Sequence, residues 1–134
     1  YEDIANLLKR SVSAWQVEME KFFTLVVFNY LFSNGDAHLK NFSLQETDGG
    51  DYVLTPAYDL MNTSIHFNDG DFALQEGLIP ESAYSDVYSK THHPCKDDFF
   101  TFGTRIGVLP KKLASIIEMF ATEQEKVYEL IFKN

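Results

Sequence analysis

Apolar side chains recur at helical spacing at the start of the chain. Ile4, Leu7 and Leu8 fall on one helical face, so the pattern predicts a short helix over residues 3–12. Asp3 precedes these apolar residues and is the expected N-cap, because its carboxylate can accept a hydrogen bond from a free backbone N–H.

A second, longer helix is predicted over residues 15–32, a stretch that contains neither Gly nor Pro. Its first half is amphipathic, with Glu18, Glu20 and Lys21 expected to face outward. Its second half, FFTLVVFNYLF, is apolar on almost every side, and a helix of that kind lies in the middle of a fold. Asn29 is interpreted as a buried amide that links this helix to the next loop. The triplet SNG is expected to end the helix.

Two short strands are predicted next, at residues 42–45 and 52–55. The link between them carries Asp-Gly-Gly, which is typical of a hairpin turn. Residues 61–96 are rich in Ser, Asn, Asp, Gly and Pro, and this pattern predicts a long loop with a short helix near residues 81–88. Loops of this length in a compact domain usually serve a function.

The last third is predicted to be helical again. A helix over residues 97–106 has acids in its first turn, and Pro110 opens a second helix over residues 110–121. The stretch TEQE is a capping-box pattern, which predicts a separate last helix over residues 122–132. The sequence therefore predicts a mainly α fold with one small β-hairpin, forming a single domain over residues 1–134.

Composition and charge narrow the class of protein. With 45% hydrophobic and 15% aromatic residues, the chain can form a real core. A net charge of -9 argues against direct binding to nucleic acid. The single cysteine, Cys95, suits a reducing compartment, so we expect a cytoplasmic protein. No apolar run approaches the ~20 residues needed to span a bilayer. The chain starts with Tyr rather than Met, and we expect it to be a piece of a longer protein.

The loop NGDAHLKNF follows the apolar helix and concentrates polar groups. Asp36 and Asn41 lie five positions apart on it, and the hairpin is expected to return Asp59 beside Asn41. Mg²⁺ prefers a few oxygen ligands together with water and phosphate oxygens, a role that Asn41 and Asp59 would fill. Asp36 would then be left to accept the proton of an incoming hydroxyl, which is the arrangement of kinases.

Each of these residues also has a plainer interpretation. Asp36 could be only a turn residue after Asn-Gly, Asn41 could be a loop stabiliser, and Asp59 could cap a following helix.

The stretch FNYLFSNGDAHLKNFSL, followed by LTPAYDLMNT, resembles the C-terminal domain of the HipA family of bacterial toxin kinases. The resemblance covers residues 20–65 closely and the stretch DDFFTFGTRIGVLPKKL more loosely. It implies a helical C-terminal kinase lobe and Ser/Thr protein kinase activity that depends on Mg²⁺ and ATP. By resemblance, Asp36 is the catalytic Asp, and Asn41 and Asp59 are the Mg²⁺ ligands.

The resemblance also implies partners. Family members belong to toxin–antitoxin modules, and some phosphorylate an aminoacyl-tRNA synthetase. A protein substrate and a HipB-like DNA-binding antitoxin are therefore the expected partners, without direct binding of this chain to nucleic acid or membrane. His38 lies where protein kinases often have a Lys that touches the transferred phosphate, so it either takes that role or braces the loop. Lys40 is expected to screen phosphate charge.

One part of the kinase pattern is missing from the sequence. No Gly-rich loop precedes residue 33, and no strand resembling Val-Ala-Ile-Lys is found there. The N-terminal nucleotide-binding lobe is therefore expected to lie outside this chain, and the isolated chain is expected to phosphorylate poorly. Two other functions stay open, namely a protein-interaction module with a silent kinase-like fold, and a lobe of a small-molecule or lipid kinase.

Two further motifs receive the plainer interpretation. The stretch HHPC at residues 92–95 lacks a matching second ligand pair, so we interpret it as a loop element rather than a zinc site. The helices at 97–106 and 110–121 resemble a helix-turn-helix, but only Lys111 and Lys112 are basic at the second helix, which argues against DNA reading.

Overall fold

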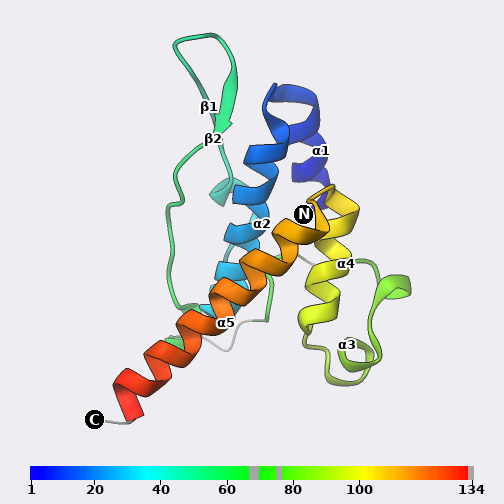
Figure 1. Cartoon of the computed structure of the whole chain (residues 1–134), viewed down its shortest axis with the longest axis vertical. Helices are drawn as coiled ribbons and strands as arrows, with labels where there is room; N and C mark the ends of the chain where they lie inside the picture. Colours follow the sequence, from blue (N-terminus) through cyan, green and yellow to red (C-terminus); the bar gives the residue numbers. More distant parts are fainter. Residues whose placement is uncertain (67–69, 75–76, 133–134) are drawn as a thin grey trace.

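The computed structural model describes residues 1–66, 70–74 and 77–132. These residues form five α-helices and one small antiparallel hairpin, which confirms the mainly α prediction (Figure 1). The helices are α1 (Glu2–Ser11), α2 (Trp15–Leu31), α3 (Asp86–Thr91), α4 (Lys96–Ile106) and α5 (Pro110–Phe132), and the strands are β1 (Leu44–Glu46) and β2 (Tyr52–Leu54).

Helix α2 is the central element. It packs against α1, α4, α5 and β2, and its side chains Met19, Phe22 and Phe23 are fully buried. The apolar second half therefore lies in the middle of the fold as far as Asn29, as its pattern predicted, whereas Leu31 at its end is 38% exposed. Across the described part of the chain, no helix combines the length and the apolar character that a membrane span requires.

The hairpin β1–β2 is shorter than predicted and begins later. Leu44 pairs with Leu54, and a turn in which Gly50 adopts a φ of 76° joins the strands. The predicted first two strand residues lie outside the ladder. One of them, Phe42, packs its ring against Phe22 at a centroid distance of 5.2 Å, so the core rather than the sheet determines its position.

Glu18 does not face outward as predicted; only 3% of its surface is exposed. Its carboxylate accepts a hydrogen bond of 2.8 Å from the backbone N–H of Leu54 and one of 2.7 Å from Lys21 Nζ. Because β2 is an edge strand, this N–H has no strand partner, and a buried donor requires an acceptor. Glu18 supplies the acceptor and ties the hairpin to α2.

Helix α1 begins one residue earlier than predicted, and Asp3 is not its N-cap. Tyr1 takes the N-cap position, and its carbonyl accepts a hydrogen bond from Ala5 N at 3.1 Å. Asp3 instead lies in the first turn beside Glu2, where negative charge favours the positive end of the helix dipole.

The predicted break before residue 122 is wrong, because α5 runs without interruption from Pro110 to Phe132. Thr122 does not cap a new helix; its hydroxyl donates to the carbonyl of Glu118 at 3.0 Å, within the same helix. Residues 111–121 contain neither Gly nor Pro, so nothing in the backbone stops the helix before the TEQE pattern. In Figure 1 the C-terminal half of α5 extends beyond the other helices.

The predicted long loop contains more regular structure than expected. Short 3₁₀ turns form at Thr63–Ile65 and Glu81–Ala83, and α3 follows. The helix predicted near residues 81–88 is thus a 3₁₀ turn and then a shifted α-helix, which begins after Ser85 because that hydroxyl accepts the N–H of Tyr88. Residues 67–69 and 75–76 of the predicted loop lie outside the described residues.

Candidate functional site

The loop after α2 is joined to the end of that helix. Ser33 turns the chain with a φ of 55°, and Asn34 N donates to the carbonyl of Asn29 at 2.8 Å. The side chain of Asn34 also donates to Asn29 Oδ1 at 3.0 Å, and both residues are buried. Asn29 is therefore a satisfied core amide that links the helix to the loop, as predicted.

The segment after the hairpin, residues 55–63, is called the returning segment and runs beside the same loop. Asn34 Nδ2 also donates to the carbonyl of Asp59 at 3.2 Å. Thr63 makes three more hydrogen bonds to the loop. Its Oγ1 accepts from Gly35 N at 3.0 Å and donates to the carbonyl of Ser33 at 3.2 Å, and its N–H donates to the same carbonyl at 3.1 Å. The loop and the returning segment are thus fastened together near Asp59 and at Thr63.

Asn41 and Asp59 are in direct contact. Asn41 Nδ2 donates to Asp59 Oδ2 at 3.0 Å, so the hairpin returns Asp59 beside Asn41 as predicted. Asp59 adopts a left-handed backbone with a φ of 57°. Residues other than Gly take this conformation at a cost, and such outliers gather at functional sites.

One oxygen of this pair points to a missing partner. Asn41 is 7% exposed, and within the described residues its buried Oδ1 atom has no hydrogen-bond partner. A buried amide oxygen without a partner is costly unless another group satisfies it. The exposed Asp59 carboxylate lies beside it, and together they form the partial oxygen set that suits Mg²⁺. The residues present therefore fit the predicted metal.

Asp36 lies in the same loop but is not part of this pair. Its backbone carbonyl accepts a hydrogen bond from His38 N at 2.7 Å, which tightens the turn. Its side chain is exposed, and within the described residues no hydrogen bond to its carboxylate is found. A carboxylate without such a partner can accept a proton from a group that approaches from solvent.

His38 and Lys40 take different positions in the loop. His38 is half-buried at the start of the short 3₁₀ helix Leu39–Asn41, and its buried Nδ1 has no partner within the described residues. Its backbone carbonyl accepts from Asn41 N at 3.0 Å. The Lys40 side chain is exposed. The role of either side chain toward phosphate stays a prediction.

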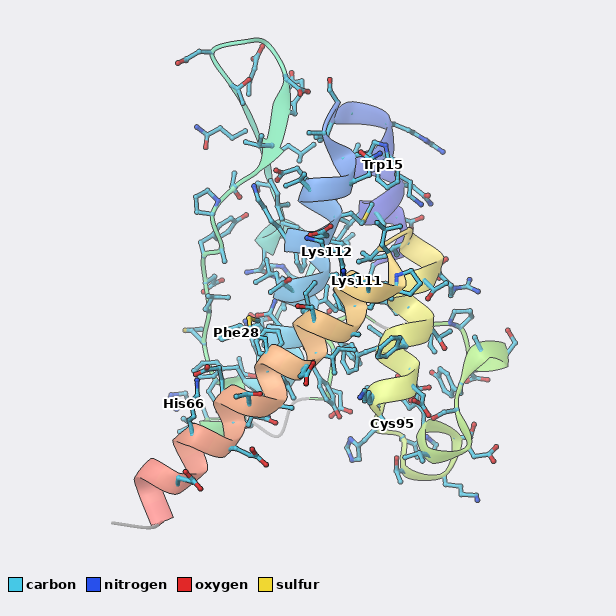
Figure 2. The ribbon with its side chains drawn as sticks, viewed as in Figure 1. Trp15, Phe28, His66, Cys95, Lys111 and Lys112 are labelled. Atoms are coloured by element: carbon cyan, nitrogen blue, oxygen red, sulfur yellow. The ribbon has the colours of Figure 1, made fainter. Side chains whose placement is uncertain are left out.

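The basic pair at the start of α5 lies on the helix surface, close to α2. Figure 2 labels Lys111 and Lys112 there. Lys112 Nζ lies 3.1 Å from a carboxylate oxygen of Glu20 on α2, so one of the two cations is paired within the chain.

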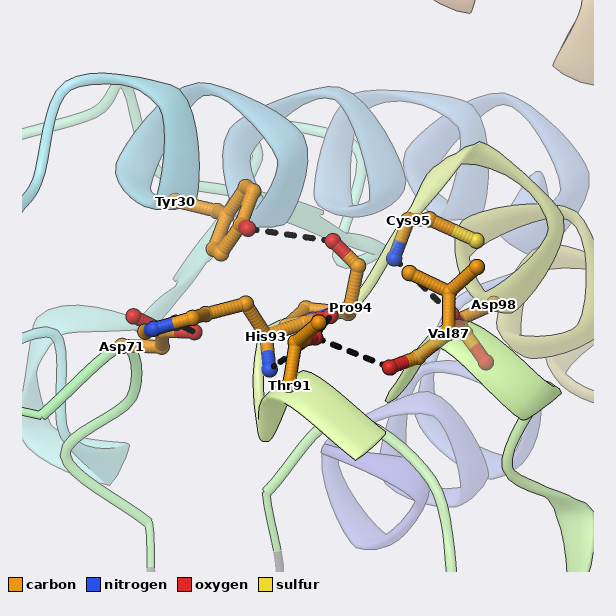
Figure 3. Close-up of polar contacts among 8 residues, drawn as sticks. All are labelled: Tyr30, Asp71, Val87, Thr91, His93, Pro94, Cys95 and Asp98. Carbon is orange, nitrogen blue, oxygen red and sulfur yellow. Dashed lines mark hydrogen bonds and ion pairs between the residues drawn. The ribbon is translucent and has the colours of Figure 1, made fainter. Parts of the chain in front are cut away.

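The His-His-Pro-Cys stretch serves packing and capping in this structure. Figure 3 shows His93 facing Asp71, with His93 Nδ1 2.7 Å from Asp71 Oδ2, while the Tyr30 hydroxyl donates to the carbonyl of Pro94 at 3.0 Å. Cys95 is the N-cap of α4. Within the part of the chain that the structure describes, no three His, Cys, Asp or Glu side chains gather closely enough to hold a metal ion.

Sequence reasoning missed the residues that hold the site together. Asn34 was interpreted only as part of a helix stop, although its spacing of five from Asn29 was visible in the sequence. Thr63 gave no signal, because a Thr in a polar loop has many ordinary explanations.

The comparisons with known proteins concern the family of the chain. The family model described as HipA-like C-terminal domain matches residues 1–128. A protein of Haemophilus influenzae named "Putative kinase" is 28% identical over 144 aligned residues, which cover 97% of this chain and 40% of that protein. Two proteins of Sinorhizobium fredii, "Putative kinase Y4dM" and "Putative kinase Y4mE", are 41% and 35% identical over 42% and 47% of this chain, and over 14% and 15% of their own lengths.

The chain therefore spans less than half the length of the relatives that it matches. The family match, by contrast, covers almost all of the chain, including the loop, the hairpin and the helical tail. This chain belongs to the HipA-like C-terminal domain family.

Proposed function

We propose that this chain is the catalytic lobe of a Ser/Thr protein kinase that transfers a phosphoryl group from Mg–ATP to a protein hydroxyl. The observation that supports it most directly is the Asn41–Asp59 pair, in which a buried amide oxygen without a partner lies beside an exposed carboxylate. The family membership and the relatives named as kinases support the same class of reaction.

Each residue of the site has one task in this proposal. Asp36 accepts the proton of the substrate hydroxyl and orients its oxygen toward the phosphoryl group. Asn41 Oδ1 and the Asp59 carboxylate hold Mg²⁺, which when bound neutralises charge on the phosphate oxygens. Asn34 keeps the backbone of Asp59 against the loop, so the two oxygen ligands stay in place before the metal binds.

The biological setting is part of the proposal. The rest of the kinase, including the parts that clamp ATP, lies outside residues 1–134, in keeping with the 40% share of the Haemophilus influenzae relative. By family likeness, the whole protein acts in the cytoplasm as the toxin of a toxin–antitoxin module. It phosphorylates a protein substrate and binds a DNA-binding antitoxin.

The proposal is tested by titrating the chain with Mn²⁺, which has the same preference for oxygen ligands as Mg²⁺ and is visible by electron paramagnetic resonance. Asn41→Ala removes one oxygen ligand, and Asp59→Asn replaces a carboxylate ligand with a neutral amide, so each is expected to weaken binding by about tenfold or more. Asp48→Asn in the exposed hairpin turn removes the same charge as Asp59→Asn and is expected to leave the affinity unchanged.

Equal Mn²⁺ affinity of wild type, Asp59→Asn and Asn41→Ala would contradict the assignment of the two ligands. Loss of affinity in Asp48→Asn as large as that in Asp59→Asn would show that net charge alone attracts the ion.

A further inference from the structure

The hydroxyl group of Tyr58 connects the two segments that carry the candidate metal ligands. Its oxygen lies 2.5 Å from the carbonyl oxygen of Lys40 and 2.6 Å from Ser43 Oγ. Tyr58 directly precedes Asp59, and Lys40 directly precedes Asn41. The contact therefore runs alongside the Asn41–Asp59 hydrogen bond, one residue earlier on each segment.

The proton positions in this contact follow from the chemistry of the groups. A carbonyl oxygen only accepts, so Tyr58 must donate its single proton to Lys40. Ser43 must then donate to the Tyr58 oxygen. The result is a directed chain from Ser43 through Tyr58 to the Lys40 carbonyl, in which each hydroxyl proton has one acceptor.

The Lys40 carbonyl needs this donor. It lies in the last turn of the 3₁₀ helix Leu39–Asn41, where terminal carbonyls lack donors from within the helix. The two preceding carbonyls, of His38 and Leu39, accept from Asn41 N and Phe42 N. Tyr58 extends this pattern by one residue, with a donor from the returning segment.

Burial of the Tyr58 ring does not by itself fix this arrangement. Tyr58 is 41% exposed and both hydrogen bonds of its hydroxyl lie at the surface, whereas Asn41 nearby is 7% exposed. A further backbone hydrogen bond, from Thr55 N to the Ser43 carbonyl at 2.9 Å, brings the returning segment alongside the loop just before Tyr58. The hydroxyl, rather than the ring, makes the specific contact.

We propose that the Tyr58 hydroxyl is a positioning group that holds Asn41 and Asp59 at the separation at which both bind one divalent cation. This inference rests on the proposed function. With the hydroxyl present, two parallel contacts fix the loop against the returning segment. With it removed, the Asn41–Asp59 hydrogen bond and the hydrogen bond from Asn34 to the Asp59 carbonyl remain, but the backbone beside Asn41 loses its direct tie to Tyr58, so the Asn41 side chain can shift relative to Asp59.

The experiment uses Tyr58→Phe, which removes only the hydroxyl oxygen. Tyr52→Phe is the matched control, since Tyr52 on β2 is 39% exposed and its hydroxyl makes no hydrogen bond that we find within the described residues. We expect Tyr58→Phe to weaken Mn²⁺ binding by about three- to tenfold, the equivalent of one lost hydrogen bond. Tyr52→Phe is expected to bind Mn²⁺ with wild-type affinity. The affinity of Ser43→Ala is expected to lie between those of Tyr58→Phe and Tyr52→Phe.

A second measurement separates the two proposals. In the metal-free protein, the ¹⁵N resonance of the Asn41 side-chain amide is expected to shift or broaden in Tyr58→Phe and to stay unchanged in Tyr52→Phe. An unchanged Asn41 resonance together with wild-type Mn²⁺ affinity in Tyr58→Phe would overturn the positioning role. Failure of the wild type to bind Mn²⁺ would contradict the proposed function instead, so the two failures appear in different signals.

Discussion

Asn34 donates from one amide nitrogen to two oxygens, the side chain of Asn29 and the backbone carbonyl of Asp59. If Asp replaced Asn34, its carboxylate could not donate a hydrogen bond, and its negative charge would lie against both acceptor oxygens. Asn34 and Asn29 are both buried, so water does not readily replace a hydrogen bond lost between them.

We expect Asn34→Asp to lower the free energy of unfolding by about 1–3 kcal/mol, the cost of unsatisfied buried groups, and to weaken Mn²⁺ binding. The measurements are urea denaturation and the Mn²⁺ titration. Asn62→Asp adds the same charge nearby but keeps the oxygen that accepts from Ser64, so it is the control and is expected to change little. Equal losses of stability in Asn34→Asp and Asn62→Asp would show that the added charge, and not the lost hydrogen bonds, causes the effect.

Asp98 is another buried residue that affects stability, in this case through its ionisation. Its carboxylate accepts hydrogen bonds from Ser85 N, Ser85 Oγ and Cys95 N, each 2.8 Å long, and so joins the starts of α3 and α4. Burial raises the pKa of such a group, but the hydrogen bonds from Cys95 and Ser85 outweigh it and hold the pKa of Asp98 below its ordinary value of 3.8.

A lowered pKa in the folded state means that ionised Asp98 stabilises the fold above pH 3.8, and that this contribution is lost as the pH falls further. We expect the free energy of unfolding of Asp98→Asn to be lower than that of wild type by about 1–3 kcal/mol at pH 7. This difference is expected to shrink as the pH falls below 3.8. Urea denaturation across this range measures both. The exposed neighbour Asp97→Asn is the control, and a pH-independent difference for Asp98→Asn would contradict the role of its charge.

At the scale of elements, close packing determines which helices touch. Gly103 of α4 lies against α5, and a Cβ added there would overlap Leu113 and come within 3.0 Å of Phe23 Cε2. Leu113 and Phe23 are both fully buried, so neither can move aside into solvent. Helix propensity and packing therefore make opposite predictions for this position.

Propensity alone predicts that Gly103→Ala stabilises α4 by about 1 kcal/mol. We expect the opposite, a net loss of about 1–3 kcal/mol, because the added methyl group overpacks the α4–α5 contact. Thermal denaturation measures the change, with the exposed Thr104→Ala as a control for propensity. Combining Gly103→Ala with Leu113→Ala should recover part of the loss, and simple additivity of the two losses would contradict steric overlap.

At the scale of the whole molecule, the chain has a net charge of -9 and spans 40% of the Haemophilus influenzae relative. Phosphoryl transfer depends mostly on positioning and electrostatic stabilisation, and the ATP-clamping parts are not found among the motifs of this chain. A negatively charged chain that carries the proposed metal site without an ATP clamp is expected to bind nucleotide weakly.

We expect residues 1–134 to bind Mg–ATP with a Kd in the high-micromolar to millimolar range, about 4–6 kcal/mol, and only when Mg²⁺ is present. Calorimetric titration measures this, with Asp59→Asn as the control that should lose binding. The whole gene product is expected to bind more tightly and to phosphorylate faster. Turnover by residues 1–134 alone at the ~1–100 s⁻¹ typical of kinases would contradict this division of labour.

The sequence by itself determined the fold class, the central position of α2 and the meeting of Asn41 with Asp59. These follow from local physics, since an all-round apolar helix must be buried, and a tight hairpin must return the chain. The family motif is likewise a local property of the loop and the segment after the hairpin.

The tertiary structure determined the features that depend on which groups of other segments contact a side chain. Glu18 looked like a surface residue until the edge N–H of Leu54 supplied a buried donor for it. Asn34 and Tyr58 became site residues because distant segments present carbonyl oxygens to them. Helical periodicity shows which way a side chain points within its own helix, but not which unpaired backbone group another segment brings to it, and those pairings hold this site together.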